Sequence, residues 1–372
     1  SDNQLQSLPD SIGSLSELTT LNASENELTC LPDSLNELSK LRDLDLKKNR
    51  LRSLSASFGG LKSLMYLDLR GNSLLELPLE WDNSNLRVLK LQNNELTHLP
   101  EALFPEPNDS MRTLDLSSNR LVSLHPCLGN CKSLDSLYLE NNALFSLPEE
   151  IFRDHALLKT LNISGNCLRS LPNSIAELEH LESLQARANT IRDLPSRRLL
   201  LFRVAMIDLS YNKISQIPDY LWHMPFLKVF ILRGNLITSI ALKEHYSPSE
   251  IQQLDLDDNR LKSLPQSCRL LANVRTLRLE GNQWERFPAV LTQLPNLSAL
   301  YMHQYRPLRL SGEEHIFVAS VRYADGPQPS LLRRASLGLF AMGAWIGKVV
   351  QSIFASCFSC LGGLLHMMRV WS

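Results

Sequence analysis

Two pairs of cysteines are close enough in the sequence to bind a metal ion or to exchange thiols. Cys357 and Cys360 form a C-x-x-C motif with His366 nearby, and Cys127 and Cys131 are four residues apart. A structural zinc site normally needs four ligands, and a redox-active C-x-x-C motif belongs in a strand–helix setting rather than an apolar segment. Cys131 also falls where the surrounding pattern predicts a core residue. We therefore expect no metal or thiol chemistry at either pair.

The run Asp255-Leu-Asp257-Asp258-Asn259 is similar to the start of a calcium loop. The glycine and the distal glutamate of an EF-hand do not follow it, so we interpret it as part of a repeat. The sequence also has no phosphate-binding loop, no G-x-S-x-G or H-E-x-x-H motif and no kinase signature set. These observations predict a protein that is not an enzyme and has no cofactor, no metal and no small-molecule substrate.

Composition limits the class of protein further. The 372 residues carry 38 Lys and Arg against 39 Asp and Glu, and this balance argues against a dedicated nucleic-acid binder. An apolar fraction of 44% with a net charge of −1 predicts a folded chain rather than a disordered one. Seven cysteines, an odd number without clusters, favour a reducing compartment, and no signal peptide opens the chain. We therefore expect an intracellular, cytoplasmic protein.

One pattern, L-x-x-L-x-L-x-x-N-x-L, recurs along most of the chain, and residues 41–51 and 64–74 are clear copies. Its asparagine returns every 22 to 25 residues, at Asn3, Asn26, Asn49, Asn72, Asn94, Asn119, Asn142, Asn166, Asn189, Asn212, Asn235, Asn259 and Asn282. A last copy, from residue 297, has Tyr305 in place of the asparagine. Because a unit of this length cannot bury its apolar side alone, neighbouring units must stack into a solenoid.

Each repeat is expected to contain a short strand and a short helical turn. The x-L-x-L-x stretch alternates with a period of two, which indicates a strand whose leucines are buried. A buried asparagine after it can satisfy backbone groups of adjacent turns. Most second halves follow L-P-x-x-[IL]-x-x-L-x-x-L, as in residues 31–41, and this spacing favours a short helical or 3₁₀ segment. The predicted fold class is α/β, a curved solenoid with parallel strands on its concave face and helical segments on its convex face.

This pattern resembles that of the leucine-rich-repeat superfamily, specifically its intracellular type with 23-residue repeats and a Leu-Pro pair. Ras-suppressor-like proteins, plant intracellular Ras-group proteins and secreted bacterial effectors carry such repeats. The resemblance covers residues 1–308, with departures from the Leu-Pro pair at Leu54-Ser55, Leu124-His125 and Ile240-Ala241. It implies that the concave face binds another protein and suggests, by analogy alone, a signalling protein such as a small GTPase or a phosphatase.

Three positions of each repeat are expected to point outward from the concave face: the residue between the two strand leucines, and those two before and two after it. In repeats nine and ten these positions hold the apolar residues Met206, Val229 and Ile231, which are expected to adjoin one another with Arg187, Tyr211 and Arg233 around them. This is the composition of an interface hot spot, and these six residues are the candidate protein-binding site. Ordinary strand propensity of valine and isoleucine is the alternative interpretation.

Repeats two and three place charges of both signs on the same face, at Asp43, Asp45, Lys47, Lys48, Asp68 and Arg70. Adjacent charges of opposite sign more often form a solvated, self-paired surface that contributes little energy. A docking patch for a charged partner is the alternative.

The residues after the repeats have a different composition. We expect residues 309–325 to cap the solenoid, residues 326–330 to be a linker, and residues 331–372 to be an apolar, basic and helical tail. Val349 to Met368 carry no charge, and about 20 helical residues just span the hydrocarbon layer of a membrane. Side chains suited to a lipid surface or to acylation are Arg333, Arg334, Trp345, Lys348, Cys357 and Cys360.

A membrane anchor is the favoured interpretation of the tail, and a helical cap on the solenoid or an oligomerisation helix are the alternatives. The sequence as a whole predicts an adaptor or scaffold that binds a protein on its concave face and a membrane through residues 331–372. The competing hypotheses are a secreted bacterial-type effector, the regulatory part of a larger enzyme whose catalytic region precedes Ser1, and a structural surface protein.

Overall fold

The computed structural model describes residues 3–302, apart from 56–57, 59, 79–84, 102, 105–106, 154–156, 196–202, 241 and 244–248, and also residues 322–323. The chain divides into two units, Ser1–Arg322 and Tyr323–Ser372. Apart from residues 322–323, the predicted cap and linker lie outside the described residues. So does the tail, with Arg333, Arg334, Trp345, Lys348, Cys357 and Cys360.

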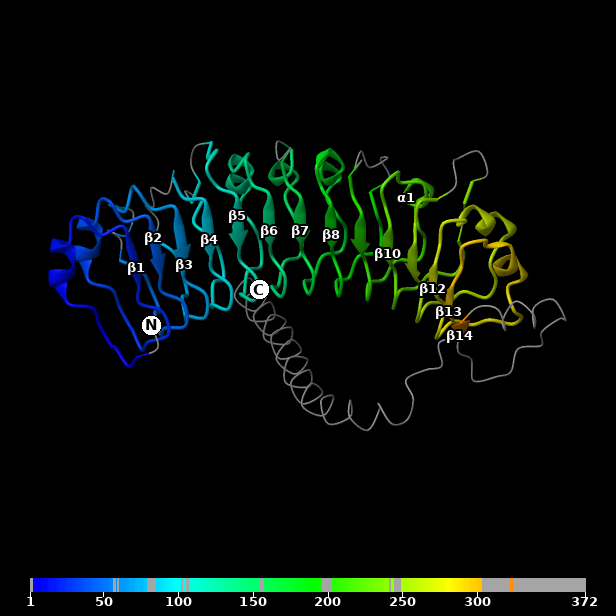
Figure 1. Ribbon diagram of the computed structural model, residues 1–372, viewed down its shortest axis with the longest axis horizontal. Coiled ribbons are helices and arrows are strands. Elements are labelled where there is room, and N and C mark those ends of the chain that lie inside the picture. Colours follow the sequence, from blue (N-terminus) through cyan, green and yellow to red (C-terminus); the bar gives the residue numbers. More distant parts are fainter. Residues whose placement is uncertain are drawn as a thin grey trace, which may run out of the picture. The chain divides into compact units, whose positions relative to one another are not determined.

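Short parallel strands lie side by side along the first unit (Figure 1). They are β1 (Thr20–Asn22), β2 (Asp43–Asp45), β3 (Tyr66–Asp68), β4 (Val88–Lys90), β5 (Thr113–Asp115), β6 (Ser136–Tyr138), β7 (Thr160–Asn162), β8 (Ser183–Gln185), β9 (Met206–Asp208), β10 (Val229–Ile231), β11 (Gln253–Asp255), β12 (Thr276–Arg278) and β13 (Ala299–Tyr301). The strands follow one another in the sheet as they do in the chain, with β14 (Arg322–Tyr323) last in the order. This confirms the predicted solenoid of parallel strands. We number the repeats by their strands, so that repeat 9 contains β9.

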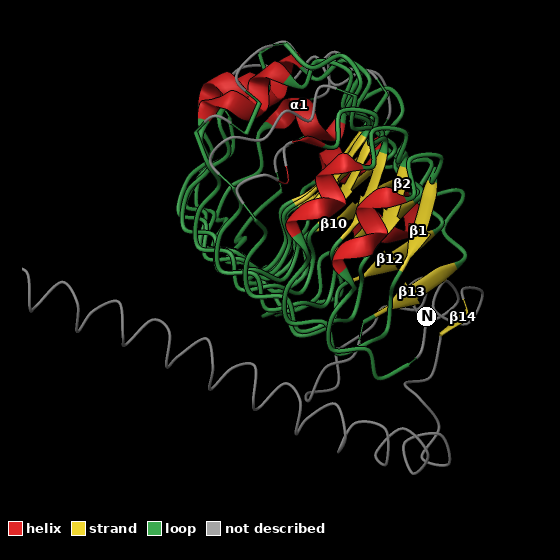
Figure 2. Cartoon of the chain, turned by 90° about the vertical axis from the view of Figure 1, so that its left-hand side faces the viewer, coloured by secondary structure: helices red, strands yellow, loops and turns green. Residues whose placement is uncertain are grey.

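Short helical turns occupy a different side of each coil from the strands (Figure 2). The 3₁₀ helices are η1 (Asp10–Ser14), η2 (Asp33–Glu37), η4 (Pro126–Asn130), η5 (Glu149–Ile151), η6 (Asn173–Glu177), η7 (Gln266–Leu270) and η8 (Ala289–Gln293), and an α-helical turn is α1 (Asp219–Trp222). Most begin directly after the proline of the Leu-Pro pair. In η1, for example, the Ile12 N–H donates to the Pro9 carbonyl at 3.0 Å. Proline suits this position because its φ is fixed and it leaves no N–H unpaired.

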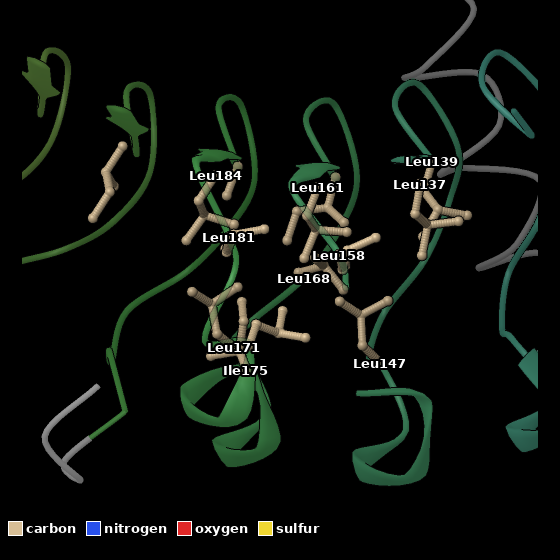
Figure 3. Close-up of a cluster of buried hydrophobic side chains, with 14 of the residues drawn as sticks. Leu137, Leu139, Leu147, Leu158, Leu161, Leu168, Leu171, Ile175, Leu181 and Leu184 are labelled. Carbon is tan, nitrogen blue, oxygen red and sulfur yellow. The ribbon is translucent and has the colours of Figure 1, made fainter. Parts of the chain in front are cut away.

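The leucines of the repeat fill one continuous apolar core between the strands and the helical turns (Figure 3). Leu161 of β7 and Leu184 of β8 are partners in register on adjacent parallel strands, so they lie side by side, and both are almost fully buried. Burial of one such side chain contributes about 1.5–3 kcal/mol. Because each layer is completed by the next repeat, the stability of a repeat depends on its neighbours.

The asparagine of each repeat joins two adjacent repeats, as predicted. Asn49 is 7% exposed; its Oδ1 accepts a hydrogen bond from the Leu28 N–H at 3.0 Å, and its Nδ2 donates to the Ala23 and Leu46 carbonyls, both at 3.0 Å. Equivalent bonds are made by every repeat asparagine from Asn72 to Asn282. The amide thereby satisfies backbone groups that the turn would leave unpaired.

The residue before this asparagine has a positive φ, which the sequence analysis did not predict. It is a glycine at Gly71, Gly165, Gly234 and Gly281, and a residue with a side chain at Glu25, Lys48, Asn93, Ser118, Asn141, Ala188, Tyr211 and Asp258. Glycine, asparagine and aspartate tolerate this left-handed conformation best. Their recurrence at one position of the repeat was the signal that could have revealed it.

In the described ranges, no helix has both the length and the apolar character that crossing a membrane requires.

Candidate binding surface on the strand face

The first and third residues of each strand and the residue two positions after it form one surface, which we call the strand face. It corresponds to the face that was predicted to be concave. Most of these side chains are half-buried, and the middle residue of each strand is directed into the core. Several polar members of the strand face are buried: Ser24, Asp68, Ser117, Ser210, Asp255 and Asp257.

Buried carboxylates on this face hold the end of the strand. Oδ1 of Asp68 accepts a hydrogen bond from the Arg70 N–H at 3.2 Å, and Oδ1 of Asp255 accepts one from the Asp257 N–H at 3.0 Å. The same bond recurs at Asn22, Asp45, Asp115, Asn162 and Asp208. Aspartate and asparagine form such turns with their own backbone two residues further on. The frequency of these two residue types at the third strand position was a signal that the sequence analysis did not use.

The candidate apolar residues lie on adjoining strands, but their cluster is smaller than predicted. Met206 of β9 and Val229 of β10 are partners in register, and both are half-buried. Ile231 has Asp208 of β9 on one side and Asp255 of β11 on the other. All three apolar side chains are half-buried rather than fully exposed, because each strand is closely flanked by its neighbours.

Tyr211 connects the two candidate arginines. Cζ of Arg187 lies 4.7 Å from the centroid of the Tyr211 ring, and Cζ of Arg233 lies 5.9 Å from it. Both distances are within the range of cation–π contacts. Gly234, with a φ of +69°, provides the space for this ring, since a Cβ at that position would come within 2.7 Å of Tyr211 Cδ1. The structure thus brings Arg187, Tyr211 and Arg233 together.

Polar contacts continue from Arg233 toward the last repeats. Nη2 of Arg233 is 2.8 Å from Oδ2 of Asp258, and its Nη1 is 4.0 Å from Oδ2 of Asp257. Nη1 of Arg278 is 3.4 Å from the same Asp257 oxygen, and Cζ of Arg278 lies 4.3 Å from the Tyr301 ring centroid. We call the connected set the arginine–tyrosine chain: Arg187, Tyr211, Arg233, Asp257, Asp258, Arg278 and Tyr301.

Asp257 is the buried centre of this chain. It is 1% exposed, and its Oδ1 accepts a hydrogen bond from the Glu280 N–H at 2.7 Å. Burial, and after it the nearby Asp255 carboxylate, raise the pKa of Asp257 from 3.8 to about 6, against the lowering effects of that hydrogen bond and of Arg278. Burial also raises the pKa of Asp255. The charge of this cluster therefore changes in mildly acidic solution.

The cations of the charged block of repeats 2 and 3 are paired, as expected for a solvated surface: Lys47 and Arg70 within the block, and Lys48 with Glu25 of repeat 1 at 3.0 Å. Nζ of Lys47 lies 3.7 Å from Oδ2 of Asp45, and Nε of Arg70 lies 3.1 Å from Oδ2 of Asp68. In each of these pairs the carboxylate neutralises the cation, so neither cation is left unpaired for a partner.

The residues considered for metal or thiol chemistry have structural roles where the structure describes them. Cys131 is fully buried, as predicted, and burial raises the thiol pKa of both Cys127 and Cys131. Asp255 ends β11, and Asn259 makes the asparagine bonds of its repeat. Within the described ranges, no three His, Cys, Asp or Glu side chains form a group that could hold a metal ion.

The leucine rich repeat family model matches residues 31–74, 84–144 and 132–191. The chain is a leucine-rich-repeat protein. A solved leucine-rich-repeat protein of Leptospira interrogans is 29% identical to it, with a TM-score of 0.72 over 86% of this chain and 81% of that one. A chain of the Drosophila Toll–Spätzle complex is 25% identical, with a TM-score of 0.65 over 76% of this chain and 44% of that one.

Two kinds of curated relative share the repeats. PH domain leucine-rich repeat protein phosphatase 1 of Rattus norvegicus is 32% identical over 177 residues, which are 46% of this chain and 10% of the phosphatase. Fibromodulin of Gallus gallus is 27% identical over 281 residues, 68% of this chain and 71% of fibromodulin. This leucine-rich-repeat chain therefore spans about a tenth of the length of the phosphatase.

Proposed function

We propose that this leucine-rich-repeat protein is a non-enzymatic adaptor or scaffold that binds another protein on the strand face of repeats 8–10. Its binding residues are Arg187, Met206, Tyr211, Val229, Ile231 and Arg233. The observation that carries the proposal is the contact of two arginines with the Tyr211 ring, in the same repeats as the Met206–Val229 pair. Arginine and tyrosine are enriched among the residues that dominate binding energy in protein interfaces.

The packing of this patch favours binding as well. Tyr211 is 39% exposed, yet its ring is held between Arg187 and the backbone of Gly234. A side chain that is ordered before binding loses less conformational entropy when a partner arrives. Leucine-rich-repeat proteins typically mediate protein–protein interactions, which agrees with this use of the face.

Two further parts of the proposal concern the class of partner, which rests on family analogy, and the location of the protein, which rests on the composition of the chain. We propose a signalling protein, of the small GTPase or phosphatase class, as the partner, in an intracellular setting. We also propose that residues 331–372 tether the protein to a membrane. Deletion of residues 331–372 should move the protein from the membrane to the soluble fraction of cells, and an intact chain found only in the soluble fraction would contradict the tether.

A second candidate function is the regulatory part of a larger enzyme. The match to the rat phosphatase supports it, because the phosphatase has these repeats within a much longer chain. A catalytic domain encoded in the same reading frame would favour this candidate over a free-standing adaptor.

The test of the binding surface is affinity capture with the full chain. The variant Val229→Asp with Ile231→Lys changes the first and third residues of β10. Its matched control, Ser136→Asp with Tyr138→Lys, places the same residues at the equivalent positions of β6. Proteins captured by the wild type and the control, but not by the β10 variant, would support the proposal. The same proteins captured by all three would refute it.

A further inference from the structure

The two arginines that flank Tyr211 differ in what already neutralises them. Nε and Nη2 of Arg233 lie 2.9 and 2.8 Å from Oδ2 of Asp258. Arg187 is exposed, and no described residue forms a hydrogen bond or an ion pair with its side chain. Its side chain instead makes a cation–π contact with the Tyr211 ring. The fold thus positions the Arg187 cation without neutralising it.

The surroundings of Arg187 leave this charge available. Ser164 and Ser210 occupy the equivalent positions of the adjoining repeats and carry no charge, as the backbone bonds Gly165 N–H to Arg187 O and Ala188 N–H to Ser210 O show. The acid on the next strand, Asp208, accepts the Ser210 N–H at 2.9 Å and is not within ion-pair distance of Arg187.

Lys90 is a cation of the same face that is less available to bind a partner. Its Nζ lies 5.3 Å from the Tyr66 ring centroid, so it also contacts a ring. In register, however, Lys90 lies between Asp68 and Asp115, and it is half-buried. Arg187 is therefore the exposed cation of the described strand face that has an aromatic support and no carboxylate beside it in its own column.

We propose that Arg187 binds a carboxylate of the protein partner, and that the partner segment is an acidic one with an apolar side chain, a few residues from that carboxylate, that packs on Met206 and Val229. This inference rests on the proposed function. A guanidinium has five N–H donors in one plane, and it can pair with a carboxylate through two parallel hydrogen bonds while it contacts an aromatic ring. Tyr211, supported by Gly234, holds the group in place before the partner arrives.

The test is a selection of binders to the full chain from a random peptide library. It is run in parallel on the wild type, on Arg187→Gln and on the matched control Arg70→Gln. Arg70 occupies the same position of repeat 3, and its loss removes the same charge from the same face. We expect Asp or Glu to be enriched a few residues from an apolar residue in the wild-type and Arg70→Gln pools, and this enrichment to disappear with Arg187→Gln.

The selected peptides then permit a double-mutant cycle. Arg187→Gln, and replacement of the peptide's acidic residue by its amide, should each weaken binding about tenfold, and the two losses should not add, because they remove one charge-assisted pair. A cooperative melting transition well above the assay temperature, for both Arg187→Gln and Arg70→Gln, would show that the fold is intact.

Three outcomes would overturn the inference. Peptides that depend on Val229 and Ile231 but show no acidic preference would contradict it and leave the proposed function standing. An acidic preference that persists in Arg187→Gln would contradict it as well. Peptides that bind regardless of both the β10 variant and Arg187→Gln would contradict the inference and the proposed function together.

Discussion

Repeats 2 and 3 and repeats 8 to 10 place cations at the same positions of the strand face, but their neighbours differ. In repeat 3, Arg70 lies 3.1 Å from the buried carboxylate of Asp68, so the charge is matched within one repeat. In repeat 8, Arg187 contacts a tyrosine ring of the next repeat. The backbone register and the asparagine bonds are the same in both regions. The comparison teaches that neutralisation within the repeat, rather than the number of charges, distinguishes a solvated surface from a candidate binding surface.

The largest expected effect tests whether the two regions share one backbone. Asn49→Ala in repeat 2 and Asn212→Ala in repeat 9 should each lower the free energy of unfolding by about 3 kcal/mol, because each leaves buried backbone groups unpaired. Urea unfolding of the full chain measures both. A loss in only one of the two regions would show that their backbones are not equivalent.

The second prediction concerns pH and separates the arginine–tyrosine chain from repeats 2 and 3. The pKa of Asp257 is raised from 3.8 to about 6, so the folded chain holds this proton more tightly than the unfolded chain does. Protonation of Asp257 therefore stabilises the fold at low pH, and this contribution is lost as the pH rises from about 4 to about 6. The stability of the wild type relative to Asp257→Asn should fall across that interval. A difference that does not change with pH would contradict the burial of this carboxylate.

A third prediction compares two glycines with the same backbone conformation. Gly71→Ala and Gly234→Ala should each lower the free energy of unfolding by at least about 1 kcal/mol, because alanine disfavours a positive φ. Gly234→Ala should cost more, since its Cβ would meet the Tyr211 ring at 2.7 Å, whereas at Gly71 the nearest contact is a flexible lysine atom at 3.4 Å. Denaturant midpoints of the two variants decide this, and equal losses would argue against the placement of the ring.

The last prediction compares Arg70 with Arg187 and is the most specific to the two regions. Arg70→Ala should lower stability by about 1–2 kcal/mol, because it leaves the buried Asp68 carboxylate without its ion pair. Arg187→Ala should cost about 0.5 kcal/mol, the value of an exposed cation–π contact. Thermal unfolding of both variants measures the difference. A larger loss for Arg187→Ala would mean that this arginine serves the fold rather than a partner.

The repeat architecture could be predicted from the sequence because its physical requirements are local and periodic. A leucine two positions from another leucine must share its face of a strand, and an asparagine at a constant interval must meet the same backbone groups in each coil. Asn49 and the core leucines confirm both inferences. The interval also fixed the register, so the flanking of Ile231 by Asp208 and Asp255 was within reach of the sequence.

The candidate site was harder to predict because it depends on side-chain directions across repeats. Arg187 and Tyr211 are 24 positions apart, and their contact depends on the left-handed backbone of Tyr211 and on the missing side chain of Gly234. The burial of Asp257 depends on neighbours on both sides of its strand, Arg233 and Arg278 among them. Charge alone, counted along the sequence, does not distinguish Arg187 from Arg70.

Footprinting of arginines with phenylglyoxal, read by mass spectrometry, tests the central claim most directly. It is applied to the full chain alone and in complex with a protein recovered by the capture experiment. The account predicts that Arg187 reacts readily in the free chain and becomes protected in the complex, while the reactivity of Arg70 stays the same. Protection of Arg70 with Arg187 still reactive in the complex would contradict it.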